Sequence, residues 1–316
     1  MNTREQLLAL NEELRRLKTE GRRTVSVSEE AMATLRASLA DEPDEAASGG
    51  GVPSPRETPV LAETRRPEFS SPPRAAEPVP VSAKPVARVA AASFTLPDGD
   101  KATRWNALRE IVLNDKVCKE HVYPGKQIVF GVGSLDASIM FVGEAPGGDE
   151  EIQGEPFVGR AGQLLNRMIK AMGLERSQVY IGNILNWRPA MGARNSDGSQ
   201  TGNRPPTADE MAYCLPFIRA QIAIIQPKVL VALGKTAVDG LLGADRFKSM
   251  GAARGAWHQY AETPLRATYH PSYLLRQEGL TSASAKKIKR DAWEDLLAVM
   301  ERANLPISEK QRNYFL

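Results

Sequence analysis

The chain has 316 residues, of which 42% are hydrophobic and 25% charged, with a formal net charge of +3. This length supports one domain of about 200 residues with a substantial core, plus additional sequence. Two cysteines are too few for a disulfide-rich secreted scaffold. The mildly basic charge permits nucleic-acid binding without requiring it. Because charges run throughout the N-terminus and no apolar run approaches the ~18 residues of a membrane helix, we expect a soluble cytoplasmic protein that contacts no membrane.

The first 95 residues differ in composition from the rest of the chain. In residues 1–40, Leu7, Leu10, Leu14 and Leu17 recur at three- and four-residue steps, which predicts a short amphipathic helix. This helix is either marginal and frayed or a docking helix for a protein partner. The first alternative is favoured because one short helix buries little surface. Residues 41–95 are rich in Pro, Ala and Ser and predict a disordered linker.

Residues 96–304 alternate short apolar runs with helical periods, and residues 305–316 form a C-terminal tail. The predicted strands cover 127–133, 138–143, 179–185, 228–234 and 266–270. Strands separated by helices favour a mostly parallel sheet covered on both faces. The sequence therefore predicts an α/β fold with three layers, α/β/α.

Two segments between these strands and one after the last strand predict helices. Leu165, Met168, Ile169 and Met172 share one face of the first helix. The segment 207–225 opens on Thr207, with Glu210 three residues later, which is the pattern of a capping box. Its interior Pro216 predicts a kink or a later start, and residues 284–302 predict a closing amphipathic helix.

Polar residues follow three of the predicted strands. Glu144 lies in the Gly-Glu-Ala-Pro-Gly run at 143–147, Asn183 lies within 179–185, and His270 opens the run 270–275. Taken singly, each is better explained as structural: a Gly- and Pro-containing loop, a strand cap and a hydrogen-bonded histidine. Sites in α/β sheets nevertheless gather beyond the carboxyl ends of strands. A carboxylate, an amide and an imidazole that converge there indicate a site that reads and acts on a small polar ligand.

These motifs together match a known family. GEAPGGDEEIQGEPFVGRAGQLL resembles the first motif of type-4 uracil-DNA glycosylases, TYHPSYLLR resembles their second, and YIGNILNWRP resembles the strand that carries their uracil-reading asparagine. The similarity covers about residues 100–302. It implies a monomer that binds uracil-containing DNA, flips the base out and hydrolyses its N-glycosidic bond, leaving an abasic site in base excision repair.

The resemblance assigns roles to the residues of the site. Glu144 would position or activate the attacking water and stabilise the cationic sugar, and His270 would donate to uracil O2 as negative charge grows there. Asn183 would read the base edge, because an amide can donate to O4 and accept from N3–H at once. Phe157 would stack on the flipped base. The uracil-binding residues implied by the resemblance are Asn183, Phe157, Gly143 and Ala145.

The resemblance also implies DNA contacts. Leu274, with Tyr273, would lie on the loop that probes the duplex and fills the vacated stack. Ser272, Arg276 and the Pro146-Gly147 turn would hold the phosphate backbone. The cationic run Lys286, Lys287, Lys289 and Arg290 either adds to this contact or forms a solvated helix face.

The chain departs from type-4 enzymes in two respects. Those enzymes carry a [4Fe-4S] cluster on four cysteines, and here only Cys118 and Cys214 remain at ligand positions, while Trp187 replaces a third cysteine. Asp115 and His121 lie three residues from Cys118, where its pair would be. We therefore expect no cofactor and no metal. In addition, the loop 188–207 lacks the histidine that a related branch uses to capture DNA covalently.

Three other functions are alternatives for this sequence. A non-catalytic protein that binds damaged DNA on the same fold is the main alternative, and the complete set of Glu144, Asn183 and His270 argues against it. Gly234-Lys235-Thr236 fails as a phosphate loop because position 229 is valine rather than the required glycine. The histidine–glutamate and paired-cysteine signature of a zinc deaminase is absent from the sequence.

Overall fold

The computed structural model describes residues 91–191, 200, 202–278, 280 and 282–315; the helix predicted in 1–40 and most of the linker predicted in 41–95 lie outside the described residues. The described part contains a six-stranded sheet in the order β1-β3-β2-β4-β6-β5. The inner neighbours pair in parallel, and β1 and β5 pair antiparallel at the two edges. The predicted, mostly parallel sheet is therefore confirmed. Its strands are β1 (Val132–Gly133), β2 (Ile139–Gly143), β3 (Tyr180–Asn183), β4 (Val229–Leu233), β5 (Trp257–Tyr260) and β6 (Thr263–Thr268).

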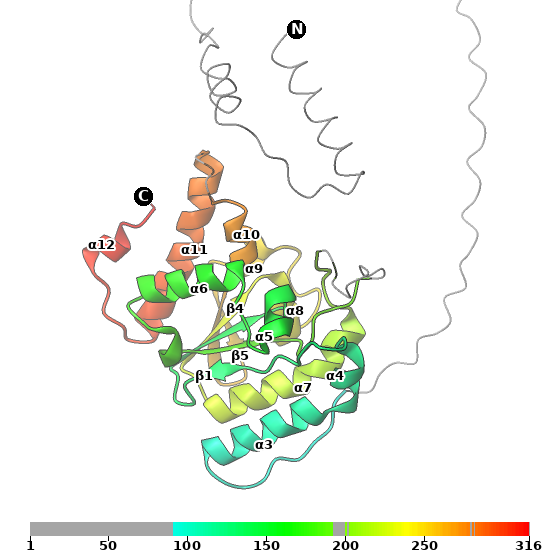
Figure 1. Ribbon diagram of the computed structural model, residues 1–316. Helices are drawn as coiled ribbons and strands as arrows, with labels where there is room; N and C mark the ends of the chain where they lie inside the picture. The colour runs from blue at the N-terminus through cyan, green and yellow to red at the C-terminus, as the bar shows by residue number, and fades with distance from the viewer. Residues whose placement is uncertain (1–90, 192–199, 201, 279, 281, 316) are drawn as a thin grey trace, which may run out of the picture. The chain divides into compact units, whose positions relative to one another are not determined.

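Helices cover both faces of the sheet (Figure 1). One core packs α6 (Arg160–Ala171) and α11 (Ala283–Arg302) on one face, and a second core packs α3 (Lys101–Asn114), α7 (Ala208–Ile225) and α8 (Lys235–Leu242) on the other. Alternate residues of β2 enter the two cores, because successive side chains of a strand point to opposite faces. The three-layer α/β/α fold is confirmed. The shorter elements are α4 (Lys116–His121), α5 (Gly148–Gln153), α9 (Met250–Ala253), α10 (Pro271–Leu275), α12 (Glu309–Arg312) and the 3-10 turn η1 (Arg176–Gln178).

The predicted helices are present. Leu165, Ile169 and Met172 are buried on one side of α6. The Thr207 hydroxyl accepts from the backbone N–H of Glu210, which completes the predicted capping box of α7. This cap determines where α7 begins, and the helix then continues through Pro216, so the predicted later start is wrong. No helix in the part of the chain that the structure describes is long and apolar enough to cross a membrane.

Two strand predictions differ from the structure. Within 127–133 only β1 is regular strand, although the Val129 N–H donates to the Asn186 carbonyl at 2.8 Å and keeps this segment beside β3. The prediction missed β5, whose side chains alternate between exposed and half-buried. Such a partly polar edge strand lacks the apolar run that marks a buried strand, and only its pairing with β6 reveals it.

The domain extends beyond both predicted boundaries. The Ala92 N–H donates to the Tyr213 carbonyl at 3.3 Å, and the Phe94 ring stacks on Phe217 with centroids 5.4 Å apart. The boundary predicted at residue 96 therefore falls inside the packed domain. At the other end, the Trp293 indole N–H donates to the Gln311 carbonyl at 2.6 Å, and Leu305 packs on the core beneath α11. Residues 305–315 are thus part of the domain and not a free tail.

This packing predicts different effects of two changes near the N-terminus. Deleting residues 1–90 is expected to leave the free energy of unfolding unchanged, because one short predicted helix and a linker poor in large apolar residues bury little surface. Phe94→Ala in the same shortened chain should lower it by about 1–3 kcal/mol, because the stacked contact with Phe217 and its buried area are lost. Urea unfolding of both proteins measures the difference. Equal stability of the two proteins would contradict the extended boundary.

Candidate active site

One cavity of about 560 Å³ lies at the carboxyl ends of β2, β3 and β6. It brings together residues that the sequence predicted as catalytic, base-binding and DNA-binding. Those that line it are Glu144, Ala145, Pro146, Gly147, Phe157, Asn183, His270, Ser272, Tyr273 and Arg276. Gly143 lies directly behind the cavity, and Leu274 lies elsewhere. The parallel sheet thus places three segments that are distant in the chain around one space.

Glu144 follows the last residue of β2, and its backbone is tied to β3 because the Leu185 N–H donates to its carbonyl at 3.1 Å. The Thr236 hydroxyl, from the first turn of α8, donates to Glu144 Oε2 at 2.7 Å. Burial raises the pKa of the Glu144 carboxyl, and the Thr236 hydrogen bond partly offsets this by stabilising the ionised form. Thr236 therefore orients the carboxylate and favours its charge.

Asn183 and Phe157 form two walls of a slot in the cavity. The Asn183 side chain is 7% exposed, and its Oδ1 has no hydrogen-bond partner among the described residues. Phe157 is also buried and holds a left-handed backbone with φ 55°, an unusual conformation for a bulky residue. A Cβ on Gly143 would collide with Asn183 Oδ1 and with the Phe157 ring. Only glycine at position 143 leaves the slot open.

His270 faces the same cavity as a neutral imidazole. Its Nδ1 accepts from the Ser272 backbone N–H at 3.1 Å and lies 2.8 Å from the Ser272 hydroxyl. Burial lowers the pKa of His270 to about 4, with a smaller effect of the positive charge of Arg276. An Nδ1 that accepts leaves the ring proton on Nε2, so this nitrogen is the available donor. Ser272, predicted as a phosphate contact, thus orients the His270 imidazole.

Two buried polar residues that the sequence analysis missed hold the loops around the cavity. Glu150 accepts from the backbone N–H groups of Gly147, Val158 and Gly159 at 3.0 Å each, which joins the Glu144 loop to the Phe157 turn. Arg188 is 8% exposed; it pairs with Glu151 at 2.9 Å and donates to Asn203 Oδ1 at 2.8 Å. Glu150 lies in the first turn of α5, directly after Gly147 and Gly148, and this position at a helix start could have marked it as a residue that binds loop N–H groups. Arg188 had no local signal.

Further residues that line the cavity were also missed. Arg204 pairs with Glu210, and Lys235 pairs with Asp239. Each of these cations therefore lines the cavity while bound to a carboxylate a few residues away in the sequence. The additional lining residues are Glu150, Ala161, Pro189, Asn203, Arg204, Pro205, Gly234, Lys235 and Thr236.

Leu274 does not occupy the position that the resemblance implied. Its side chain is 6% exposed and lines an apolar groove between α6 and α11, together with Met168 and Trp293. A side chain held there faces away from the catalytic cavity and is not placed to enter a base stack. The prediction of Leu274 as the inserted wedge is therefore not supported by this conformation. Tyr273 and Arg276, one residue before and two residues after it, do face the cavity.

The residues at the cluster positions do not fit a four-thiolate cluster. Cys118 and Cys214 are both buried and are the only cysteines of the chain. The Trp187 ring is 1% exposed and stacks on His121 with centroids 4.4 Å apart. Asp115 accepts from the Tyr213 hydroxyl at 2.8 Å and from the Cys118 N–H at 2.8 Å, so it caps α4. An aromatic side chain and a helix cap thus stand where further thiolates would be needed.

The fold and the site define a class of protein: a three-layer α/β/α domain with a carboxylate, an amide, an aromatic ring and a neutral imidazole around one cavity. Comparison with known proteins identifies the family. Residues 130–297 match the model of the uracil DNA glycosylase superfamily. The chain belongs to the uracil DNA glycosylase superfamily.

Several relatives are similar over most of their own length. The type-4 uracil-DNA glycosylase of Thermotoga maritima is 37% identical over 169 residues, which cover 54% of this chain and 79% of that protein. The type-4 uracil-DNA glycosylase of Pyrobaculum aerophilum is 34% identical over 187 residues, covering 57% of this chain and 89% of that protein. The type-4 uracil-DNA glycosylase of Sulfurisphaera tokodaii is 36% identical over 190 residues, covering 58% of this chain and 81% of that protein.

Proposed function

We propose that this protein is a uracil-DNA glycosylase that flips uracil out of DNA, hydrolyses its N-glycosidic bond and leaves an abasic site for base excision repair. One observation carries the proposal: Asn183 lines the cavity beside Phe157, and its buried amide oxygen has no hydrogen-bond partner among the described residues. Buried polar atoms are nearly always hydrogen-bonded, so an unpaired one at a cavity wall favours a ligand that supplies the donor. The N3–H of uracil is such a donor.

In the proposed reaction, the C1′–N1 bond breaks and its electron pair leaves with uracil. A water molecule bonds to C1′ through its oxygen and gives one proton to Glu144, whose carboxylate also stabilises the positive charge on the sugar. His270 donates its Nε2–H to uracil O2, where negative charge develops. Because His270 stays neutral at physiological pH, it acts by electrostatic stabilisation rather than by giving up a proton.

A strand-cleavage assay tests the proposal. The full chain is incubated with end-labelled DNA that contains one uracil, and alkali then cuts the strand wherever an abasic site has formed. Cleavage at the uracil position, and none in DNA with thymine there, is the expected result. Tight binding without any cleavage would instead favour the non-catalytic damage-binding protein.

Thr236→Val should lower the single-turnover rate roughly 10- to 150-fold near neutral pH, because a hydrogen bond to a charged group typically contributes about 1.5–3 kcal/mol. The same change removes an interaction that lowers the Glu144 pKa, so this pKa should rise. Since the proposed role requires the ionised carboxylate, the acid limb of the pH–rate profile should move to higher pH. Thr236→Ser keeps the hydroxyl, so it should keep the parent's rate and the parent's position of the acid limb on the pH axis. A profile that is the same in all three proteins would show that Thr236 does not act through Glu144.

We also propose that the enzyme works without an iron–sulfur cluster. Protein produced with ample iron and sulfide is expected to contain no stoichiometric iron and no broad visible absorbance, since two thiolates cannot supply a four-thiolate site. Prolonged treatment with an iron chelator should leave its melting temperature unchanged. A brown protein with several iron atoms per chain, or one that the chelator destabilises, would contradict this.

A further inference from the structure

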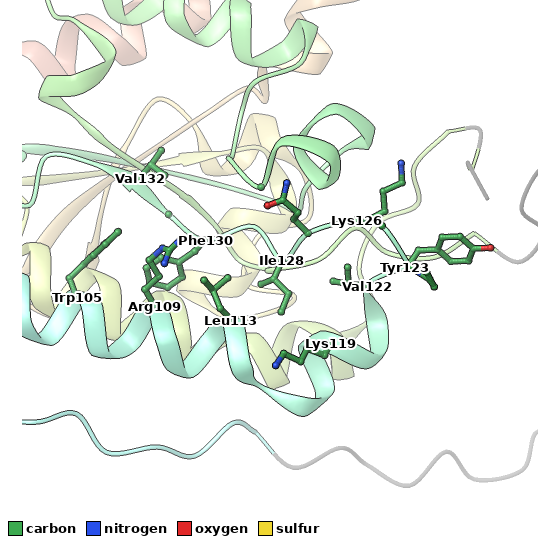
Figure 2. A pocket seen from close by; sticks show the side chains of 15 residues that line it. Trp105, Arg109, Leu113, Lys119, Val122, Tyr123, Lys126, Ile128, Phe130 and Val132 are labelled. Atoms are coloured by element: carbon green, nitrogen blue, oxygen red, sulfur yellow. The ribbon is translucent and has the colours of Figure 1, made fainter. Parts of the chain in front are cut away.

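A second cavity, of about 470 Å³, runs along the outer side of residues 122–132, between them and helices α3 and α4 (Figure 2). Trp105 forms an aromatic wall of this cavity: its half-buried ring packs edge-to-face on Phe130, which is only 4% exposed, with ring centroids 5.5 Å apart. The Trp105 indole N–H donates to the Tyr180 hydroxyl at 2.8 Å, which holds the plane of the indole. Apolar side chains of Leu113, Val122 and Ile128 complete the lining.

The charged residues that line this cavity are all cations. Arg109, Lys119 and Lys126 line it from α3, α4 and the following loop, and none of the fifteen described residues that line it is a carboxylate. Among the described residues, Arg109 pairs only with exposed Glu110, at 3.5 Å, and Lys119 donates to the neutral Asn114 amide oxygen at 3.0 Å. An exposed pair at that distance neutralises little charge. This basic groove, defined by Arg109, Lys119, Lys126, Trp105 and Phe130, therefore attracts anions.

The groove reaches the same edge of the sheet as the catalytic cavity. Residues 127–133 run antiparallel to β3, with Val132 opposite Ile181 and the Val129 N–H on the Asn186 carbonyl. Lys126 consequently lies at the end of the sheet where β3 reaches Asn183. The segment of α5 links the linings of the two sites: Gly147 and Glu150 line the catalytic cavity, and Gly154 lines the groove. The six residues of α5 rise about 9 Å, which is a short step for a DNA strand.

We propose that the basic groove binds the DNA strand on one side of the flipped nucleotide, with phosphates on its three cations and a base against its aromatic wall. This inference rests on the proposed function and extends the DNA contact beyond the catalytic cavity. A positive groove combined with aromatic side chains is the usual arrangement for holding single-stranded nucleic acid. An acidic protein segment, such as residues 41–45 of this chain, would bind the cations, but it has no aromatic or base ring to stack on the indole of Trp105. The aromatic wall and the shared sheet edge favour DNA.

Removing the three cations tests the proposal. Arg109→Ala/Lys119→Ala/Lys126→Ala in the full chain is compared with Lys170→Ala/Lys228→Ala/Lys310→Ala, which removes equal charge from exposed positions outside both cavities. Dissociation constants for uracil-free single strands of about 15 nucleotides are measured over a range of salt concentrations. The slope of log K against log salt should fall by about 2 in the groove variant, given about 0.7 per phosphate contact, while the control variant keeps the parent's slope. Because these strands contain no uracil, the result is independent of whether uracil is released.

Trimming the DNA gives the direction of the contact. Strands with uracil about two nucleotides from the 5′ end or from the 3′ end are compared for binding to each protein. The parent should lose affinity when one particular side is trimmed, and the groove variant should be insensitive to trimming on that side. Equal slopes for the groove and control variants would overturn the proposal. Tighter DNA binding by the groove variant would also overturn it, because it would mean that the groove holds an acidic segment that competes with DNA.

Discussion

Glu144→Gln is expected to lower the single-turnover rate of uracil release by roughly 100- to 10,000-fold, the range for loss of a general base together with its charge. Glutamine keeps the shape of the side chain and an oxygen that accepts from Thr236, so the geometry of the site is retained. What is lost is the proton acceptor for water and the negative charge beside the cationic sugar. The rate is measured with enzyme in excess over uracil-containing DNA.

Stability provides an independent control for this variant. A carboxyl whose pKa is raised in the folded state gives its full stabilisation at low pH, and this is lost as the pH rises through the folded pKa. Glutamine has no such loss, so Glu144→Gln should melt at or above the parent's temperature at neutral pH. Glu301→Gln, an exposed position on α11, should match the parent in rate. A well-folded Glu144→Gln protein with the parent's rate would exclude Glu144 from the chemistry.

Asn183→Asp should cost on the order of 2–4 kcal/mol of transition-state stabilisation, or about 30- to 1000-fold in rate. The amide is proposed to donate to uracil O4 while its oxygen accepts from N3–H. A carboxylate keeps the shape but removes the donor, and its oxygen then faces O4 as a second acceptor. The same carboxylate can accept from the N4 amino group of cytosine, so a trace of cytosine excision is expected, limited by repulsion at cytosine N3.

Single-turnover rates on uracil-containing and normal DNA measure this change, with circular dichroism to show that the variant is folded. Asn166→Asp is the matched control: Asn166 Oδ1 accepts from Arg176 at 3.1 Å outside the cavity, and a carboxylate can accept in the same way. Asn166→Asp should keep the parent's rate. If folded Asn183→Asp excises uracil as fast as the parent, Asn183 is not the base-reading residue.

The sequence alone was sufficient for the layers of the fold and for most of the residues around the catalytic cavity. Apolar runs and helical periods depend on neighbours a few positions away, and they determine which face of each element is buried. The order of strands and helices then places Glu144, Asn183 and His270 at one edge, because parallel strands end together. The number of cysteines likewise limits the thiolates that any cluster could use.

Only the tertiary structure decided the partners of these residues. Thr236 reaches Glu144 across 92 residues of chain, and no local pattern encodes such a contact. The neutral state of His270 depends on burial and on the nearby charge of Arg276, and the inward position of Leu274 depends on the groove between α6 and α11. The hydrophobic period of a strand or helix predicts whether a side chain is buried or exposed, but it does not predict which atoms that side chain contacts. Those contacts are set by packing between elements that are distant in sequence, which is why the cavity walls were predicted and their hydrogen bonds were not.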